Sequence, residues 1–175
     1  EIDPDTGLWG TNGYCDVRRA IYGAYHQMIL YFYHDRPINS PEHLVDCVLS
    51  IKHRDGGFSA YWGGGSCEYA DAVDLLINLH RRYDYRRGDI EQALRKAALA
   101  ILRRRSGEGG FVYKNMAPFI HNGLVKTRAP AGVANAFSTW FAVMNLAQIS
   151  TVIDLPGFDL GRPRFNNSCS MGWYD

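Results

Sequence analysis

The sequence predicts an all-α protein made of helical hairpins, arranged as the inner and outer layers of a partial or complete ring. Two observations support this fold class. A turn of glycine and aromatic residues recurs along the chain, and the segments between these turns carry apolar residues at helical spacing. Segments that are apolar on most sides alternate with segments that are apolar on one face, as expected of inner and outer helices. An ordinary helical bundle is the alternative, and the recurring turn favours the ring.

Three related turns form the repeat: Asp-Thr-Gly-Leu-Trp at 5–9, Arg-Asp-Gly-Gly-Phe at 54–58 and Gly-Glu-Gly-Gly-Phe at 107–111. Their aromatic residues lie 49 and 53 residues apart, an interval that suits two helices and two connections. Glycine allows the chain to reverse through positive φ, and the aromatic ring can fill the seam between successive hairpins.

The first three helices are predicted at 17–33, 41–52 and 68–82. The first is apolar on most sides, which indicates burial. The second has a start signal, with Ser40 as the expected N-cap and Pro41 as the first helical residue. The third is acidic at its start and basic at its end, as the helix dipole favours.

Two further helices are predicted at 89–105, with an apolar stripe opposite a charged face, and at 132–153, apolar on most sides. The segments 112–131 and 154–175 are predicted to be irregular. Segments of this length are often lids, binding loops or interface segments, and their apolar residues favour docking onto the helices.

Length and composition indicate one globular domain covering residues 1–175, because 46% of the residues are hydrophobic and 21% are charged. Lysine plus arginine (19) nearly balances aspartate plus glutamate (18), so no nucleic-acid partner is predicted. No apolar run approaches the ~20 residues of a membrane span, and no signal peptide is evident, so we expect a cytoplasmic protein. The four cysteines form no C-x-x-C pair and are interpreted as mostly reduced thiols. The chain lacks an initiator methionine, and we interpret it as a fragment or a processed piece of something longer, such as a longer toroid.

The turn Asp55-Gly56-Gly57-Phe58, followed by a loop and a buried helix, resembles the repeat of squalene-type cyclases, protein prenyltransferase β subunits and prenyltransferase/squalene-oxidase repeat proteins. The resemblance covers roughly residues 3 to 153, and 15–20 is similar to the start of an inner helix in the prenyltransferases. It implies an α/α toroid whose cavity binds an isoprenoid-like or other apolar substrate, as in a terpenoid cyclase or a transferase.

The sequence departs from the catalytic patterns of this group. Val73 stands two residues after Asp71, where a prenyltransferase has a zinc-binding cysteine, and Ser138 stands where the resemblance places the histidine. Neither the D-x-D-D nor the D-D-x-x-D motif of the cyclases occurs. We therefore assign no metal and leave the cofactor unknown, with a zinc site of Cys15, Cys67, nearby acids and His121 as an alternative.

Candidate catalytic residues lie in the first turns of the predicted inner helices, which begin at one end of such a ring. Cysteine-acid pairs occur twice there, at 15–16 and 67–68. Glu68, Asp71 and Asp74 follow at steps of three, which places them near one side of a helix. We predict Asp16, Glu68 and Asp71 as catalytic residues, because close carboxylates can hold one proton for general-acid work. Stabilisation of the helix dipole and a shared divalent cation are the alternatives.

Aromatic and histidine side chains on the inner helices are candidates for substrate binding, and we predict this role for Tyr22, His26, Trp62 and Trp140. Core packing is the alternative. The leading hypothesis is a small-molecule-binding toroid enzyme. The second is a non-catalytic helical module that binds another protein or completes a ring with a second chain, as in a homo-oligomer. A carbohydrate-active helical barrel is the third and needs two carboxylates about 5 to 10 Å apart across a groove.

Overall fold

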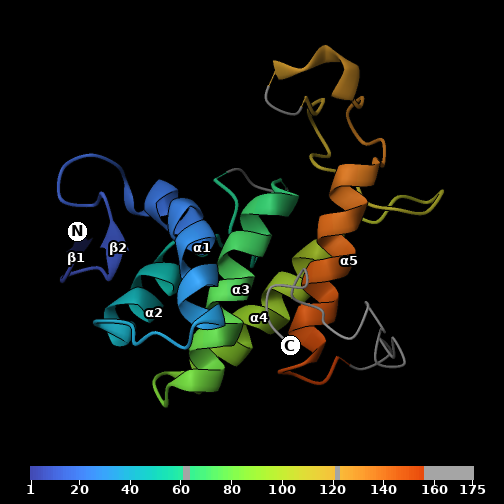
Figure 1. The fold of residues 1–175 in the computed structure, drawn as a ribbon. Helices are drawn as coiled ribbons and strands as arrows, with labels where there is room; N and C mark the ends of the chain where they lie inside the picture. Colours follow the sequence, from blue (N-terminus) through green and yellow to red (C-terminus); the bar gives the residue numbers. More distant parts are fainter. Residues whose placement is uncertain (61–63, 121–122, 156–175) are drawn as a thin grey trace.

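The computed structural model describes residues 1–60, 64–120 and 123–155, which form five α-helices and one small antiparallel sheet. The helices are α1 (Val17–Tyr33), α2 (Pro41–Ser50), α3 (Ser66–Arg82), α4 (Arg87–Leu102) and α5 (Ala136–Ser150), and the strands are β1 (Ile2–Asp3) and β2 (Leu8–Trp9) (Figure 1). The chain is mostly helical, as the sequence predicts. The predicted tail at 154–175 lies outside the described residues from 156 onward.

Helix α3 stands at the centre of the molecule (Figure 1). It packs most extensively against α5 on one side and α1 on the other, while α2 and α4 pack behind these three helices. Helices α1, α3 and α5 all begin at the upper end in Figure 1, and α2 and α4 run back in the opposite direction. The chain therefore has one row of three helices and a second row of two, and their continuation into a ring stays a prediction.

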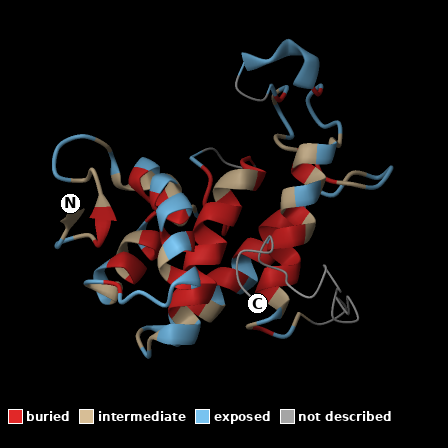
Figure 2. Ribbon diagram, viewed as in Figure 1, coloured by how far each residue is buried: buried red, intermediate tan, exposed pale blue. Residues whose placement is uncertain are grey.

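Burial follows this arrangement (Figure 2). Helix α3 is buried along nearly its whole length, because it has neighbours on both sides and behind. Helices α1 and α5 stand at the two edges of the row, and they expose Leu30 and Trp140, respectively. The prediction of burial on most sides is therefore confirmed for α3 and only in part for α1 and α5.

Several helix boundaries differ from the predicted ones. Helix α5 begins at Ala136 instead of 132, because Asn135 is extended and its side chain accepts a hydrogen bond from the Ser138 backbone N–H (2.9 Å). Ser40 occupies the predicted cap position of α2, but its backbone is left-handed (φ 59°) and its side chain makes no cap hydrogen bond. Caps depend on side-chain rotation as well as residue type, so the composition alone could not distinguish these two cases.

Two of the three predicted turns share one backbone geometry. In 53–58 and 106–111, the N–H of the first residue donates to the carbonyl of the fifth (2.7 and 3.0 Å). The N–H of the fourth residue donates to the carbonyl of the first (2.9 and 3.1 Å). That fourth residue is Gly56 or Gly109, with φ of 93° and 95°. The turn at 5–9 belongs instead to the β1–β2 hairpin.

Residues 112–120 and 123–135, which we call the arm, project from the start of α5 beyond the helices (Figure 1). Antiparallel bridges pair Val112 with Ala134 and Phe119 with Ala129. A short 3-10 helix, Val125–Thr127, lies near the far end. The predicted irregular segment is thus a folded-back extension. None of the helices within 1–60, 64–120 and 123–155 has the length and apolar character required for a membrane span.

Candidate functional site

Three carboxylates lie on successive turns of α3, and we call Glu68, Asp71 and Asp74 the α3 acids. Asp71 and Asp74 are buried, with 9% and 4% of their surface exposed, and Glu68 is half-buried. The Gln148 amide of α5 donates to Asp74 Oδ1 (2.9 Å), and the Asn78 amide lies 3.3 Å from Asp74 Oδ2. These two amides, one from α5 and one from the next turn of α3, hold the buried Asp74 carboxyl in place.

Asp71 has the most perturbed acidity of the three. Burial, followed by the neighbouring charges of Glu68 and Asp74, raises the pKa of Asp71 from 3.8 to about 8. No ion pair involves Glu68 or Asp71 within the part of the chain that the structure describes. Asp71 therefore keeps its proton at neutral pH and can act as a hydrogen-bond or proton donor.

Two tyrosines of α1 lie beside the α3 acids. Burial, together with the nearby charges of Asp71 and of Glu68 or Asp74, raises the pKa of both Tyr22 and Tyr25 above the usual value. The Tyr22 hydroxyl donates to the Phe58 carbonyl (3.0 Å), which fixes its ring at the end of the second glycine turn. Helix α1 thus contributes neutral phenol rings to the surroundings of the acids.

A buried arginine lies near the start of α3. Arg104 is 3% exposed, and its guanidinium carbon stands 4.4 Å from the centre of the Tyr69 ring. Burial lowers the pKa of Arg104, because it disfavours the charged guanidinium. Among the described residues, none of its three side-chain nitrogens has a hydrogen-bond partner, and neither does Glu68 Oε2. Buried polar atoms are usually paired, so these groups make the start of α3 suited to a polar ligand group.

Glycine is required where Glu68 folds back onto the start of α3. Gly65 has φ of 81°, and a Cβ on it would collide with Glu68 Oε2 and would stand 2.6 Å from Ser59 Oγ. Because Gly65 has no side chain, the Glu68 carboxylate has room to lie against the start of α3.

Cys67 is placed next to the acids but is poorly suited to nucleophilic chemistry. Its sulfur lies 3.6 Å from the Tyr113 hydroxyl, and burial raises the pKa of the thiol. A thiol nucleophile needs a lowered pKa or a neighbouring base. Cys15 lies elsewhere, with its sulfur 3.9 Å from the Trp9 carbonyl oxygen.

Tyr113 begins a series of aromatic contacts that leads along the arm and α5. Its ring centre lies 4.2 Å from that of Phe119, which lies 5.1 Å from Phe137. Phe137 in turn contacts Phe141 (4.9 Å), and Phe141 contacts Trp140 (4.7 Å). The structure thus connects the region of Cys67 to the exposed edge of α5 through stacked and edge-on rings.

The structure brings together Glu68, Asp71 and Tyr22 among the predicted site residues. Asp16 is exposed at the start of α1, where its carboxylate accepts a hydrogen bond from the Arg19 backbone N–H (3.0 Å) and pairs with the Arg19 side chain (3.5 Å). This is the helix-capping role that the sequence left open as an alternative.

The remaining predicted binding residues are dispersed. His26 is exposed on α1, with its ring edge-on to Tyr25 at 5.0 Å, so the core-packing alternative does not hold for it. Trp140 lies in the aromatic series of α5 and is half exposed. Trp62 and His121 lie outside the described residues.

Sequence reasoning missed Arg104 and Gln148. Arg104 is the middle residue of the arginine run 103–105, a composition typical of a solvated helix end. It stands two residues beyond the end of α4 and seven after Ala97, in line with the apolar stripe of that helix, and that spacing is the signal that separates it from its neighbours. Gln148 and Asn145 are polar residues three apart in a stretch of α5, 140–149, that is otherwise apolar, a pattern that indicates a buried polar contact.

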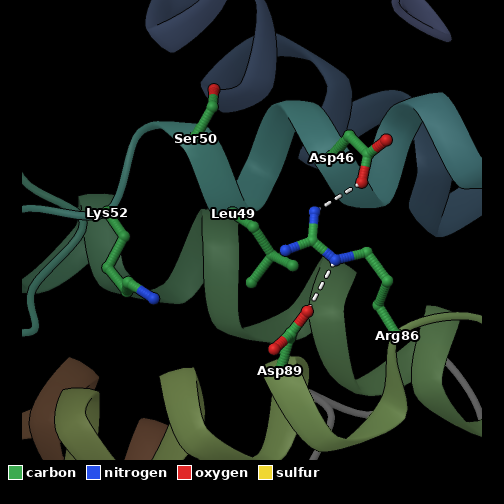
Figure 3. A pocket seen from close by; sticks show the side chains of 6 residues that line it. All are labelled: Asp46, Leu49, Ser50, Lys52, Arg86 and Asp89. Carbon is green, nitrogen blue, oxygen red and sulfur yellow. Dashed lines mark hydrogen bonds and ion pairs between the residues drawn. The ribbon is translucent and has the colours of Figure 1, made fainter.

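A separate hollow of about 200 Å³ lies between α2 and α4, in the row of two helices (Figure 3). Arg86 crosses it and pairs with Asp46 and Asp89, at 2.7 Å each. Leu49, Ser50 and Lys52 complete its lining. The residues predicted as catalytic or substrate-binding do not line it, and its arginine is already engaged by both carboxylates.

Comparisons of the chain with protein-family models, with curated proteins and with solved structures found no match. Within residues 1–60, 64–120 and 123–155, no cluster of three or more His, Cys, Asp or Glu side chains is arranged to hold a metal ion. The α3 acids with their tyrosines are therefore the site on which a functional hypothesis can be based.

Proposed function

We propose that the chain binds an apolar, isoprenoid-like organic molecule beside the α3 acids and that Asp71 acts on it as a general acid. The observation that carries this proposal is the setting of Asp71. Its buried carboxyl lies between two other carboxyls and beside two tyrosines, without an ion pair among the described residues. Burying a carboxyl in this setting opposes folding. Such perturbed groups are concentrated at functional sites.

The proposed chemistry is one proton transfer. The Asp71 carboxyl gives its proton to an alkene or oxygen atom of the substrate, which becomes cationic, and Asp71 becomes a carboxylate. The faces of Tyr22 and Tyr25 favour a positive charge on the substrate. Loss of a proton from the substrate to Asp71, or addition of water followed by that loss, completes the cycle and restores the acid.

The test compares the wild-type chain with Asp71→Asn, which keeps the shape but cannot donate the acid proton. Farnesol and squalene are the probes, with equilibrium dialysis for binding and mass spectrometry for products. We expect Asp71→Asn to bind the probes as the wild type does and to lose turnover by about 100-fold or more. Asp89→Asn, an exposed carboxylate on α4, is the matched control and should leave turnover unchanged. Equal turnover in Asp71→Asn, or no binding of either probe by the wild type, would refute the proposal.

A non-catalytic module that associates with another chain is the second candidate, and the exposed apolar arm favours it. The carbohydrate-active alternative has less support. It needs two carboxylates that face each other across a groove, whereas the α3 acids share one helix.

A further inference from the structure

Charge is divided unequally between the two ends of the three-helix row. From Gly109 to Ile153 the sequence contains lysine and arginine at 114, 126 and 128 and neither aspartate nor glutamate. From Glu1 to Asp16 it contains four acids and neither lysine nor arginine. The cationic segment includes the arm beside α5, and the acidic segment includes the β1–β2 hairpin beside α1, so the two lie at opposite ends of the row (Figure 1).

Most of the arm is exposed to solvent (Figure 2), and its exposed residues include apolar and cationic ones. Ile120, Leu124 and Val125 are 41%, 59% and 73% exposed. Lys126 and Arg128 are exposed, and their side chains make no hydrogen bond or ion pair within the described part of the chain. Several exposed apolar side chains on one projecting segment, next to charges without partners, are typical of an interaction site.

The hairpin end has the complementary character. Glu1 and Asp5 are exposed there, and Tyr14 is 89% exposed in the connection between β2 and α1. His43 Nδ1 lies 2.7 Å from the Pro4 carbonyl oxygen, which holds the first turn of α2 against the hairpin. That turn adds the exposed Glu42 to the same acidic end.

We infer that copies of this chain associate head to tail, with the arm of one copy on the acidic hairpin end of the next. The chain itself supplies both complementary surfaces, and opposite charges at an interface favour this orientation over arm-to-arm pairing. Because each copy uses two different surfaces, the interface is heterologous and forms closed rings or open chains. This inference does not depend on the proton chemistry proposed for Asp71.

The test measures the mass of the 175-residue chain by sedimentation over a wide range of concentration, at low and at high salt. We expect the mass to rise with concentration and the association to weaken with salt, because salt screens exposed charges. Lys126→Glu with Arg128→Glu, and separately Glu1→Lys with Asp5→Lys, should each weaken association by about tenfold or more. A mixture of these two double variants should recover it, because each then supplies the surface that complements the other.

Lys96→Glu with Arg103→Glu is the matched control, since it makes the same charge change on exposed positions in α4 and directly after its end and should leave association unchanged. Lys126→Gln with Arg128→Gln removes the charge without reversing it and should weaken association less. Circular dichroism verifies that each variant is folded. The inference is overturned by a monomer at every concentration, by association that both reversals leave intact, or by binding of the wild-type chain to phosphatidylserine vesicles without self-association.

Discussion

At the scale of single residues, the spacing of Glu68, Asp71 and Asp74 in the sequence predicted their shared side of a helix, and the structure has them on successive turns of α3. What the spacing could not show is which acid holds the proton. That depends on the burial of Asp71 among helices that are distant in the sequence and on the neighbouring charges of Glu68 and Asp74. Asp16 has a similar local sequence to Glu68, but it lies at the exposed start of an edge helix and caps it.

The raised pKa of Asp71 predicts how the stability of the fold depends on pH. Its pKa is about 8 in the folded chain and 3.8 for the unperturbed group, so the folded state binds the proton more tightly. The stabilisation that comes from this tighter proton binding is present in full at a pH below the unperturbed pKa, and it is lost as the pH rises through the pKa of the folded chain. The free energy of unfolding should therefore decrease as the pH rises from 3.8 to about 8, by on the order of a few kcal/mol. Urea titrations at several pH values measure it.

Asp71→Asn is the variant for this prediction, since an amide does not ionise in this range. Its unfolding free energy should depend less on pH between the two pKa values than that of the wild type, and should exceed that of the wild type at the alkaline end. A wild-type profile as flat as that of Asp71→Asn would show that the carboxyl is ionised throughout.

At the scale of elements, local signals predicted the existence and order of all five helices, because apolar spacing and turn composition lie within each segment. Boundaries were less accurate, since they depend on side-chain caps and on backbone conformation, as at Ser40 and Asn135. The recurring turn was visible in the sequence, and the matching hydrogen bonds at 53–58 and 106–111 give it a structural basis. The divergence of the turn at 5–9 reflects its place in a β-hairpin, which the short motif did not reveal.

The two matching turns provide a controlled comparison. Gly56 and Gly109 have nearly the same positive φ, so alanine is strained at both, by about 1 kcal/mol. A Cβ on Gly56 would stand 2.8 Å from the Lys96 carbonyl oxygen of α4, whereas a Cβ on Gly109 would meet nothing within 4 Å. Gly56→Ala should therefore lower the free energy of unfolding by a further ~1–3 kcal/mol.

Thermal or urea unfolding of both alanine variants measures the difference between their losses of unfolding free energy. The cost of positive φ is common to both variants and cancels in that difference. Equal losses of unfolding free energy in Gly56→Ala and Gly109→Ala would show that the turn at 53–58 is not in close contact with α4.

At the scale of the whole molecule, one side chain ties the first hairpin to the second. Arg18 of α1 donates to the Ile51 carbonyl at the end of α2 (2.9 Å) and to the carbonyls of Phe58 (2.7 Å) and Ser59 (3.2 Å) in the connection to α3. The row of α1 and α3 is thus joined through the turn between α2 and α3 as well as by apolar packing. Sequence patterns predicted the helices but not this contact, which spans 33 to 41 residues.

Replacement of Arg18 by methionine keeps much of the apolar stem and removes the donors, so three carbonyl groups lose a partner. Charge-assisted hydrogen bonds of this kind contribute about 1.5 to 3 kcal/mol, and we expect Arg18→Met to lower the free energy of unfolding by about 2 to 3 kcal/mol. Arg19→Met is the matched control, since Arg19 is 80% exposed and pairs with Asp16 at the surface, and its effect should stay within about 0.5 kcal/mol. Urea unfolding of the two variants measures both values. Equal losses of unfolding free energy in the two variants would mean that the three hydrogen bonds from Arg18 to the α2–α3 connection contribute nothing to stability. The junction between the hairpins would then depend on apolar packing alone.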